Sequence, residues 1–273
     1  MAVVEEGGVR RWLVDITRWR PSPAQFDAAA ALLTPHERPA IASGSSSVAC
    51  CSTRWCAMFL ASRSTRSAYA AQLKGNRTWQ DRNATFPNFN FNASHQGDYV
   101  GIASEPLCLV GMDIVFISKP QGETVTEFIS NFSSYLTDHE WDCIVRAGTP
   151  NEVLTEFYRY WCLKEAFVKA IGSGVGFGLN RLEFHHVHWT NICIHIDGKE
   201  SRKWRFRLFK LDEMHLASIA KGNPEDAVSS YNKTLSTVIV EEEQLHATLE
   251  ITEDAFTLWT VEQLIQLQDE QAF

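Results

Sequence analysis

Two acidic residues occur where apolar side chains surround them. Asp113 lies inside the run Leu109-Val110-Gly111-Met112-Asp113-Ile114-Val115-Phe116-Ile117, which predicts a buried strand. Glu165 lies on the apolar face of a predicted helix, one turn after Trp161 and one turn before Lys169. A carboxylate in such surroundings is costly unless it is paired or bound to a metal ion. Two of them, together with phosphate oxygens, suit a hard cation, and Mg²⁺ is the natural candidate.

A purely structural explanation stays open for both acids. Glu165 could form an ion pair with Lys164 or Lys169 at the edge of the apolar stripe. Asp113 could cap a backbone turn or form a salt bridge elsewhere in the core.

Two further polar groups deserve a chemical interpretation. The segment Asn92-Ala93-Ser94-His95-Gln96-Gly97-Asp98 could direct donors at an anion, although an ordinary loop is the simpler interpretation. Histidines on the later predicted strands suggest zinc, but they lack the spacing of a zinc motif, which makes this the weaker hypothesis. These histidines are His185, His186, His188, His195 and His215.

The elements that must position these residues are predicted to be strands and helices without strict alternation. The strands are expected at 12–16, 99–103, 107–117, 182–187, 192–196, 204–209 and 216–220, with a turn at Asp197-Gly198 between the middle pair. The helices are expected at 24–33, at 124–134, from the Thr137/Glu140 capping box to Gly148, from Asn151 as N-cap to Ile171 before Gly172, and near the C-terminus. This order predicts an α+β fold.

Composition narrows the class of protein. The chain has 273 residues, 45% of them hydrophobic, which can fill a real core, and no apolar run approaches the roughly 20 residues of a membrane span. The acidic N-terminal residues predict no targeting segment. Seven cysteines without paired metal spacings are typical of reduced thiols in a cytosolic protein. The net charge of −8 argues against a nucleic-acid partner, and we expect no membrane partner.

One segment differs from the rest. Residues 38–80 contain no Asp or Glu, although the chain has 33, and residues 43–68 are rich in serine and contain three cysteines. No helical or strand period is found there, and a loop of this length would exceed the usual limit of about 15 residues. We therefore treat residues 39–81 as atypical.

Three segments together resemble a known family. Asn90-Phe91-Asn92-Ala93-Ser94-His95, Gly111-Met112-Asp113-Ile114 and the run from Trp161 to Gly172 resemble the three signatures of 4′-phosphopantetheinyl transferases of the surfactin-synthetase-activating type. They look most like the eukaryotic branch that includes the aminoadipate-semialdehyde dehydrogenase phosphopantetheinyl transferase. The order and spacing of all three motifs make the signal specific. The resemblance covers the N-terminal strand and helix and then about residues 86–220.

The resemblance implies an architecture and a reaction. The fold would be a pseudo-twofold monomer of two similar α+β halves, with coenzyme A in the cleft between them. The halves would be residues 1–105 and 106–221, the second with the metal site, followed by an acidic extension at 222–273. The enzyme would move 4′-phosphopantetheine from coenzyme A to a serine of an apo acyl or peptidyl carrier protein in the cytosol. It would release 3′,5′-ADP and require Mg²⁺.

The resemblance also implies roles for individual residues. Asp113 and Glu165 would bind Mg²⁺ together with the pyrophosphate of coenzyme A, and Glu165 would be the candidate base for the serine hydroxyl. Lys169 would contact phosphate and act in catalysis, and Lys164 would contribute to the coenzyme site. The remaining coenzyme contacts would come from the first signature, with His95 near the 3′-phosphate; these residues are Asn92, Ala93, Ser94 and His95. Many bacterial members carry another acid where this chain has Val115, so a water molecule would fill that coordination position.

The chain departs from the family at residues 39–81. The family has there an arginine-containing helix and a Gly-Lys-Pro segment that hold the adenine nucleotide, and neither is found. A displaced reading frame, genuine divergence and an alternative exon all remain open as explanations. We therefore expect weak coenzyme A binding. The alternative function is a weak or inactive homologue that still binds carrier proteins; Asp113, Glu165 and Lys169 argue against an unrelated Mg²⁺-dependent nucleotide-binding protein.

Overall fold

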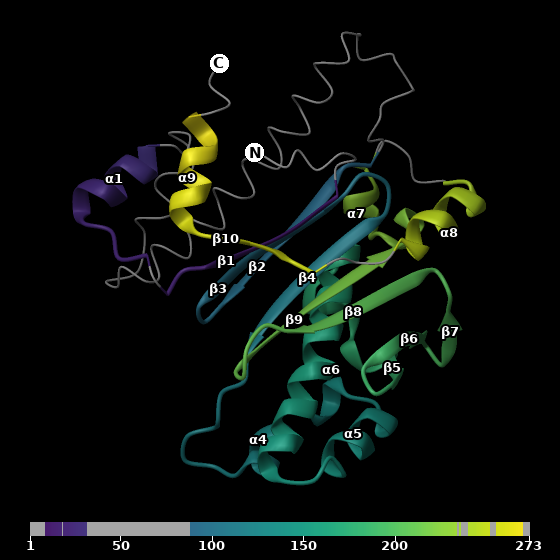
Figure 1. Cartoon of the computed structure of the whole chain (residues 1–273). Helices are drawn as coiled ribbons and strands as arrows, with labels where there is room; N and C mark the ends of the chain where they lie inside the picture. The colour runs from purple at the N-terminus through teal and green to yellow at the C-terminus, as the bar shows by residue number, and fades with distance from the viewer. Residues whose placement is uncertain are drawn as a thin grey trace. The chain divides into compact units, whose positions relative to one another are not determined.

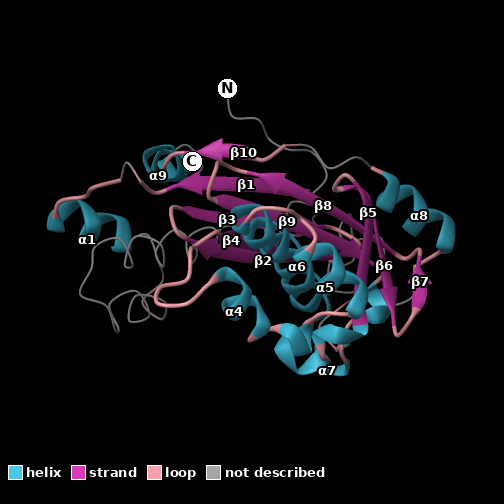
Figure 2. Cartoon of the chain, turned by 90° about the horizontal axis from the view of Figure 1, so that it is seen from below, coloured by secondary structure: helices cyan, strands magenta, loops and turns pink. Residues whose placement is uncertain are grey.

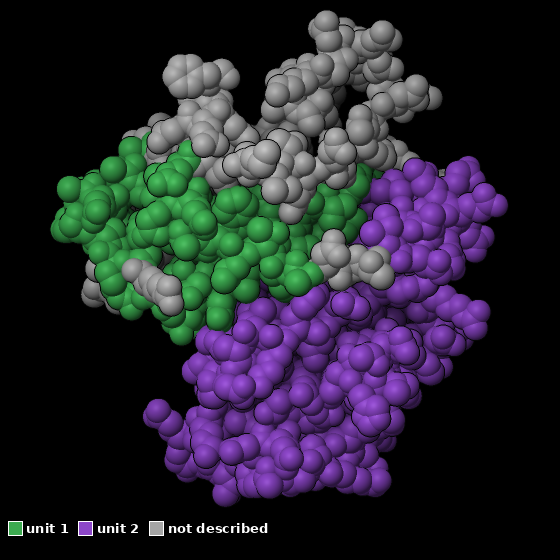
Figure 3. All heavy atoms as spheres, viewed as in Figure 1, with its two compact units in different colours: residues 1–106, 254–273 green, residues 107–253 purple. Residues whose placement is uncertain are grey.

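The computed structural model describes residues 9–17, 19–31, 88–233, 235, 240–251 and 255–269 (Figure 1). The chain divides into two compact units, one of residues 1–106 and 254–273 (unit 1) and one of residues 107–253 (unit 2), which are coloured separately in Figure 3. The atypical segment predicted at 39–81 lies outside the described residues. Among the described cysteines, four are free thiols, namely Cys108, Cys143, Cys162 and Cys193.

Unit 1 contains a four-stranded sheet in the order β10-β1-β3-β2. The strands are β1 (Arg10–Asp15), β2 (Asn90–Gln96), β3 (Tyr99–Glu105) and β10 (Thr257–Trp259). β3 runs antiparallel to both β1 and β2, whereas β10 pairs with β1 in parallel, with Leu13 opposite Leu258. The strands predicted at 12–16 and 99–103 are confirmed.

The core of unit 1 forms between this sheet and two helices, α1 (Pro23–Ala31) and α9 (Val261–Asp269). Strand residues Val14, Val100 and Ile102 are fully buried, and helix residues Ala29 and Leu264 pack in the same cluster. Apolar side chains of both kinds of element therefore share one core, as an α+β unit requires.

Unit 2 is organised around a long helix and a sheet in the order β4-β9-β8. The strands are β4 (Leu109–Phe116), β8 (Trp204–Lys210) and β9 (His215–Gly222), all antiparallel to their neighbours. The helix, α6 (Pro150–Ile171), lies along this sheet in Figures 1 and 2 and buries twelve of its residues. Large apolar side chains such as Phe157, Phe167 and Trp204 make up the core.

The ends of α6 follow from local capping chemistry. Thr149 is the N-cap, because its side chain accepts from the Glu152 N–H while the Glu152 carboxylate accepts from the Thr149 N–H at 2.7 Å. Pro150 follows at the first helical position. The predicted N-cap, Asn151, was therefore wrong by two residues. Gly172 ends the helix in the left-handed conformation (φ 75°), as predicted.

A second small sheet in unit 2 has the order β5-β6-β7. Its strands are β5 (Leu182–Val187), β6 (Thr190–Ile196) and β7 (Lys199–Ser201). Asp197 and Gly198 both have positive φ (52° and 78°), as a two-residue hairpin turn of type I′ requires. The turn was predicted to join β6 to the strand at 204–209. It instead joins β6 to β7, a strand too short to give a sequence signal, and β8 pairs with β9.

The remaining elements of unit 2 are short. They are α4 (Val125–Ser130), η1 (Ser133–Tyr135), α5 (Asp138–Val145), η2 (Gly174–Phe177), η3 (Leu179–Arg181), η4 (Pro224–Asp226), α7 (Ser229–Asn232) and α8 (Glu242–Glu250). The predicted capping box of Thr137 and Glu140 opens α5. The helix predicted at 124–134 is shorter, and the segment predicted as a separate extension at 222–273 is divided between the two units.

The α+β class predicted from the sequence is confirmed. Among the described residues, no helix is long and apolar enough to cross a bilayer.

Candidate active site

Asp113 occupies the middle of β4, in the interior of unit 2. The residue is only 6% exposed, and its register partner on β9 is Ser218, which is fully buried. Because side chains alternate along a strand, Asp113 lies on the same face of β4 as Gly111. The position of Gly111 therefore tells which element the carboxylate faces.

Gly111 is the point where β4 touches α6. A Cβ atom added to Gly111 would lie 1.9 Å from the carbonyl oxygen of Ala166 and 2.6 Å from the backbone nitrogen of Ala170. Only a glycine allows the strand backbone to lie so close to the helix backbone. Glu165 and Lys169 directly precede these two alanines, so the contact brings both side chains beside Asp113.

The carboxylate of Asp113 accepts a short hydrogen bond from Lys169. The Nζ atom of Lys169 lies 2.6 Å from Oδ1 of Asp113, and the exposed fractions of the two side chains are 29% and 9%. The salt bridge that was one structural explanation of Asp113 is therefore present. It joins the second and third of the three sequence motifs, which are 56 residues apart.

Glu165 is the second carboxylate of the site, and it is partly buried. Burial raises the pKa of Glu165, the negative charge of Asp113 raises it further, and the ammonium of Lys169 lowers it. The negative charges of Asp113 and Glu165 therefore disfavour each other, and the ammonium of Lys169 offsets part of this repulsion. The two lysines predicted as possible ion-pair partners of Glu165 pair with other carboxylates. Lys164 pairs with Glu140, and Lys169 pairs with Asp113.

This donor set fits a hard divalent cation. Two carboxylates supply oxygen ligands of the kind that Mg²⁺ binds. One of them, Asp113, already binds a positive charge, the ammonium of Lys169. Mutual repulsion of two carboxylates is relieved when a cation binds between them. Asp113 and Glu165 are thus able to hold Mg²⁺.

A buried hydrogen-bond network holds the backbone of Asp113 against the helix. The thiol of Cys162 lies 3.5 Å from the carbonyl oxygen of Asp113 and 3.2 Å from the hydroxyl oxygen of Ser218. The Ser218 hydroxyl donates to the carbonyl oxygen of Cys162 at 2.7 Å. Burial, and secondly the charge of Asp113, raise the pKa of Cys162, so its thiol stays neutral and acts as a donor. The network links β4, β9 and α6 at the position of Asp113.

Lys164 does not lie with Asp113, Glu165 and Lys169, because its side chain points into the interior of unit 2. Its side chain is fully buried, and its ammonium pairs with the carboxylate of Glu140 at 2.7 Å and donates to the carbonyl oxygens of Leu179 and Leu182. These three partners use all three N–H donors of a lysine. The structure thus gives Lys164 a role in the interior of unit 2, and its predicted contact with coenzyme A stays a prediction.

The buried pair of Lys164 and Glu140 was not found from the sequence. Glu140 was read only as the third helical residue of a capping box, and it does accept from the Thr137 N–H at 3.1 Å. Its carboxylate also accepts from the N–H of Phe184 at 3.0 Å. The available signal was the position of Lys164 on the apolar stripe of its helix, which marks a lysine that needs a buried partner.

The predicted coenzyme residues of the first motif lie in unit 1. Asn92, Ala93, Ser94 and His95 belong to β2 and pair with β3, with Asn92 opposite Ala103 and His95 opposite Val100. Ser94 is buried, whereas His95 is exposed. The interpretation of 92–98 as an ordinary loop was wrong, because the strand continues to Gln96 and turns only at Gly97-Asp98. The coenzyme role of these residues stays a prediction.

Comparison with known proteins adds independent information. The model of the 4′-phosphopantetheinyl transferase superfamily matches residues 109–220, a range that includes Asp113, Glu165 and Lys169. The L-aminoadipate-semialdehyde dehydrogenase-phosphopantetheinyl transferase of Rattus norvegicus is 32% identical over 248 residues, with 79% of this chain and 75% of that protein covered.

Two further relatives agree with this result. The Homo sapiens protein of the same name is 32% identical over 247 residues, again with 79% of this chain and 75% of that protein covered. A phosphopantetheinyl transferase of Thraustochytrium sp. is 40% identical over 138 residues, with 48% of each chain covered.

Proposed function

The chain is an enzyme of the 4′-phosphopantetheinyl transferase superfamily, and we propose that it transfers the 4′-phosphopantetheine group of coenzyme A to a serine of an apo-carrier protein. The second product would be 3′,5′-ADP, and the reaction would require Mg²⁺. The carrier would be an acyl or peptidyl carrier protein domain. The reaction would take place in the cytosol, where the free thiols of the described cysteines would stay reduced, and the enzyme would act as a monomer.

One observation carries the proposal. Asp113, Glu165 and Lys169 converge where β4 and α6 touch at Gly111, with Asp113 and Lys169 joined at 2.6 Å and Glu165 within reach of both charges. Phosphoryl transfer needs little covalent chemistry from the protein and depends mainly on positioning and on neutralising charge. Two carboxylates and a lysine on a rigid strand–helix contact are suited to that task.

In this proposal each residue has a distinct role. Asp113 and Glu165 hold Mg²⁺, which when bound would neutralise charge on the pyrophosphate oxygens of coenzyme A. Lys169 donates to a phosphate oxygen and stabilises the negative charge that builds up as the pyrophosphate bond breaks. Glu165 accepts the proton of the carrier serine, because a carboxylate beside the reacting groups can act as the general base.

The chemical change is a single displacement at phosphorus. The serine oxygen forms a bond to the phosphate that carries pantetheine, and the bond from that phosphorus to the bridging pyrophosphate oxygen breaks. The serine proton goes to Glu165, and 3′,5′-ADP leaves with the bridging oxygen. Asn92, Ala93, Ser94 and His95 are proposed to contact coenzyme A, with His95 near the 3′-phosphate.

The test is direct transfer to a carrier. The purified chain is incubated with an apo-acyl carrier protein, coenzyme A and MgCl₂, and the carrier is weighed by intact mass spectrometry. We expect the carrier to gain one phosphopantetheine group, and expect EDTA to stop the reaction. The Asp113→Asn and Glu165→Gln variants should each lose most of the activity, whereas Glu213→Gln, at a well-exposed position, should keep it.

Two outcomes would contradict the proposal in different ways. Transfer at the normal rate by Asp113→Asn or Glu165→Gln would remove these residues from the machinery. A chain that binds the apo-carrier but adds no mass at any Mg²⁺ concentration would favour the alternative function, an inactive homologue that retains carrier binding.

A further inference from the structure

Three potential metal ligands lie together on the β5–β6 hairpin. Glu183 is the register partner of His195, and His185 follows Glu183 by two residues. Alternation along the strands therefore puts all three side chains on one face of the hairpin. The opposite face is apolar, because Leu182, Phe184 and Ile194 are fully buried in the core of unit 2.

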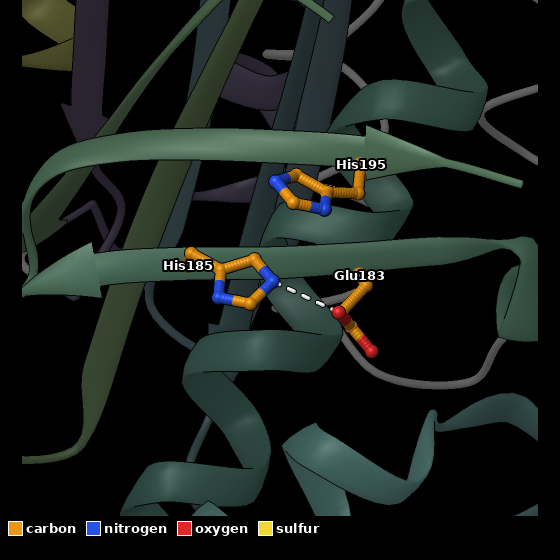
Figure 4. Close-up of side chains that lie close together, drawn as sticks. All are labelled: Glu183, His185 and His195. Atoms are coloured by element: carbon orange, nitrogen blue, oxygen red, sulfur yellow. Dashed lines mark hydrogen bonds and ion pairs between the residues drawn. The ribbon is translucent and has the colours of Figure 1, made fainter. Parts of the chain in front are cut away.

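The three side chains point toward one another. Figure 4 shows His185 and Glu183 on one strand and His195 on the adjoining one. Each residue offers one ligand atom, and these atoms all lie within 4.8 Å of one another. Nε2 of His185 is 2.8 Å from Oε1 of Glu183, and the ring centroids of His185 and His195 are 4.4 Å apart. All three residues are partly exposed, so an ion can reach them from solvent.

Helix α5 borders the cluster and restrains it. The ring of His139 stacks on that of His185, with centroids 4.4 Å apart and planes at 21°. The sulfur of Cys143 lies 3.9 Å from Nε2 of His139. Rings held by stacking and strands held by a ladder lose little freedom when they bind an ion, and such neighbours are what orient the ligands of a metal site.

An ordinary ion pair explains only part of this arrangement. A protonated His185 paired with Glu183 would need no second imidazole, yet His195 and His139 both lie at stacking distance from His185. Two imidazole nitrogens and a carboxylate oxygen within 4.8 Å of one another are instead the arrangement that a single metal ion can join.

We propose that Glu183, His185 and His195 form a binding site for a divalent transition-metal ion of the Zn²⁺ type. Two imidazoles and a carboxylate are a ligand set that Zn²⁺ accepts, with a fourth position left for water. The set differs in kind from Asp113 and Glu165, because imidazole nitrogen favours transition metals whereas oxygen-only sets favour Mg²⁺. The inference does not depend on the proposed transferase function.

A bound ion would join β5 to β6 and stabilise the small sheet, because a ligand that binds only the folded chain raises its stability.

The experiment uses the full chain, stripped of metal with a chelator. To remove the carboxylates of the candidate active site from the measurement, both the reference protein and its variants carry Asp113→Asn and Glu165→Gln. Zn²⁺ binding is followed by calorimetry, and Co²⁺ binding by the visible absorption of the coordinated ion. We expect one site in this reference protein that Mg²⁺ does not occupy at equal concentration. Zn²⁺ should also raise the thermal midpoint.

Substitution of single ligands locates the site. His195→Ala and Glu183→Gln should each weaken Zn²⁺ binding by at least about 10-fold, since even the partners of metal ligands are worth about 10- to 100-fold. The matched control is His246→Ala, an exposed histidine paired with Glu250 on α8, which should bind Zn²⁺ as the reference does. Glu183→Gln keeps the shape of the side chain and so decides the matter if His195→Ala folds poorly.

Two results would overturn the proposal. One is a reference protein that binds neither Zn²⁺ nor Co²⁺. The other is equal Zn²⁺ affinity in the reference, Glu183→Gln and His195→Ala proteins, which would assign the ion to other residues.

Discussion

Nζ of Lys169 on α6 lies 2.6 Å from Oδ1 of Asp113 on β4, so the lysine pairs with the carboxylate that we propose as a ligand of Mg²⁺. The two cations would then compete for the same oxygen atoms until coenzyme A arrives and its phosphates offer Lys169 another partner. Loss of the Lys169 charge should therefore change Mg²⁺ binding and coenzyme A binding in opposite directions.

Lys169→Met should bind Mg²⁺ more tightly than the unmodified chain when coenzyme A is absent. Removal of a positive charge a few Å from the metal ligands is worth about 1 kcal/mol or more, so we expect a gain of roughly 10-fold. Transfer should nevertheless fall, because a charge-assisted contact to phosphate worth about 1.5–3 kcal/mol is lost. Calorimetry with MgCl₂ and the transfer assay measure the two effects, with Lys169→Arg as the charge-retaining control. Weaker Mg²⁺ binding by Lys169→Met would contradict the competition.

Gly111→Ala should damage both the fold and the site. The new methyl group would lie 1.9 Å from the Ala166 carbonyl oxygen, a backbone atom of α6 that cannot swing aside, so β4 has to move. Overpacking of this kind costs about 1–3 kcal/mol or more. The matched control is Gly176→Ala, where the added Cβ meets nothing within 4 Å. Chemical denaturation of both variants, followed by transfer assays, checks this; equal stability of the two would refute the close contact.

The buried pair of Lys164 and Glu140 should be expensive to break from one side. Burial is the main reason why the pKa of Glu140 is raised and that of Lys164 lowered, so each group depends on its partner to stay charged. Lys164→Met should reduce the free energy of unfolding by about 3–5 kcal/mol, and adding Glu140→Gln should recover part of that loss. Arg181→Met, which removes an exposed ion pair with Asp197, should have a far smaller effect. A double variant no more stable than Lys164→Met would argue against coupling.

Glu165 should make the chain less stable as pH rises when Mg²⁺ is absent. The pKa of Glu165 is raised in the folded state above its ordinary value of 4.5, first by burial and then by Asp113. The protonated group therefore stabilises the fold fully below about pH 4.5, and this contribution is lost as pH rises through the folded-state pKa. Glu165→Gln should gain stability relative to the unmodified chain over that range, as measured by urea unfolding in EDTA at pH 4 and pH 7.5.

Glu152 supplies a control of opposite sign. Hydrogen bonds from the side chain and then the backbone of Thr149 lower the pKa of Glu152 below 4.5. Its contribution is present above that pH and is lost as pH falls through the folded-state pKa. Glu152→Gln should therefore be the less stable protein at pH 7.5 and lose this difference in acid. Parallel pH profiles for the two variants would contradict both assignments.

Local patterns predicted much of unit 2 correctly. The apolar run around Asp113 is a strand, the Thr137/Glu140 capping box opens a helix, and Gly172 ends α6. These features depend on residues close together in the sequence. The start of α6 was misplaced because Thr149, Pro150 and Glu152 form a stronger cap than Asn151, a signal that was present and not used.

Features that depend on pairing between distant segments could not be predicted from local sequence patterns. The carboxylate partner of Lys164 is 24 residues away on another helix, and nothing in the spacing selects Glu140. The cluster of Glu183, His185 and His195 needs the register of β5 on β6, which a one-residue slip would destroy. The two carboxylates of the candidate active site could be found because each is anomalous within its own segment.

The parallel pairing of β10 with β1 affects the order in which the two units can fold during synthesis. β1 spans Arg10–Asp15 and its parallel partner β10 spans Thr257–Trp259, so the sheet of unit 1 stays incomplete until residue 259 has left the ribosome. Unit 2 is continuous from residue 107 to residue 253 and can close its core earlier. Because contacts between distant segments form slowly, β1 must wait for β10, which is made more than 240 residues later. During that interval the edge of β1 that β10 later covers is open to pairing with other strands, which is a risk of mispairing for the nascent chain.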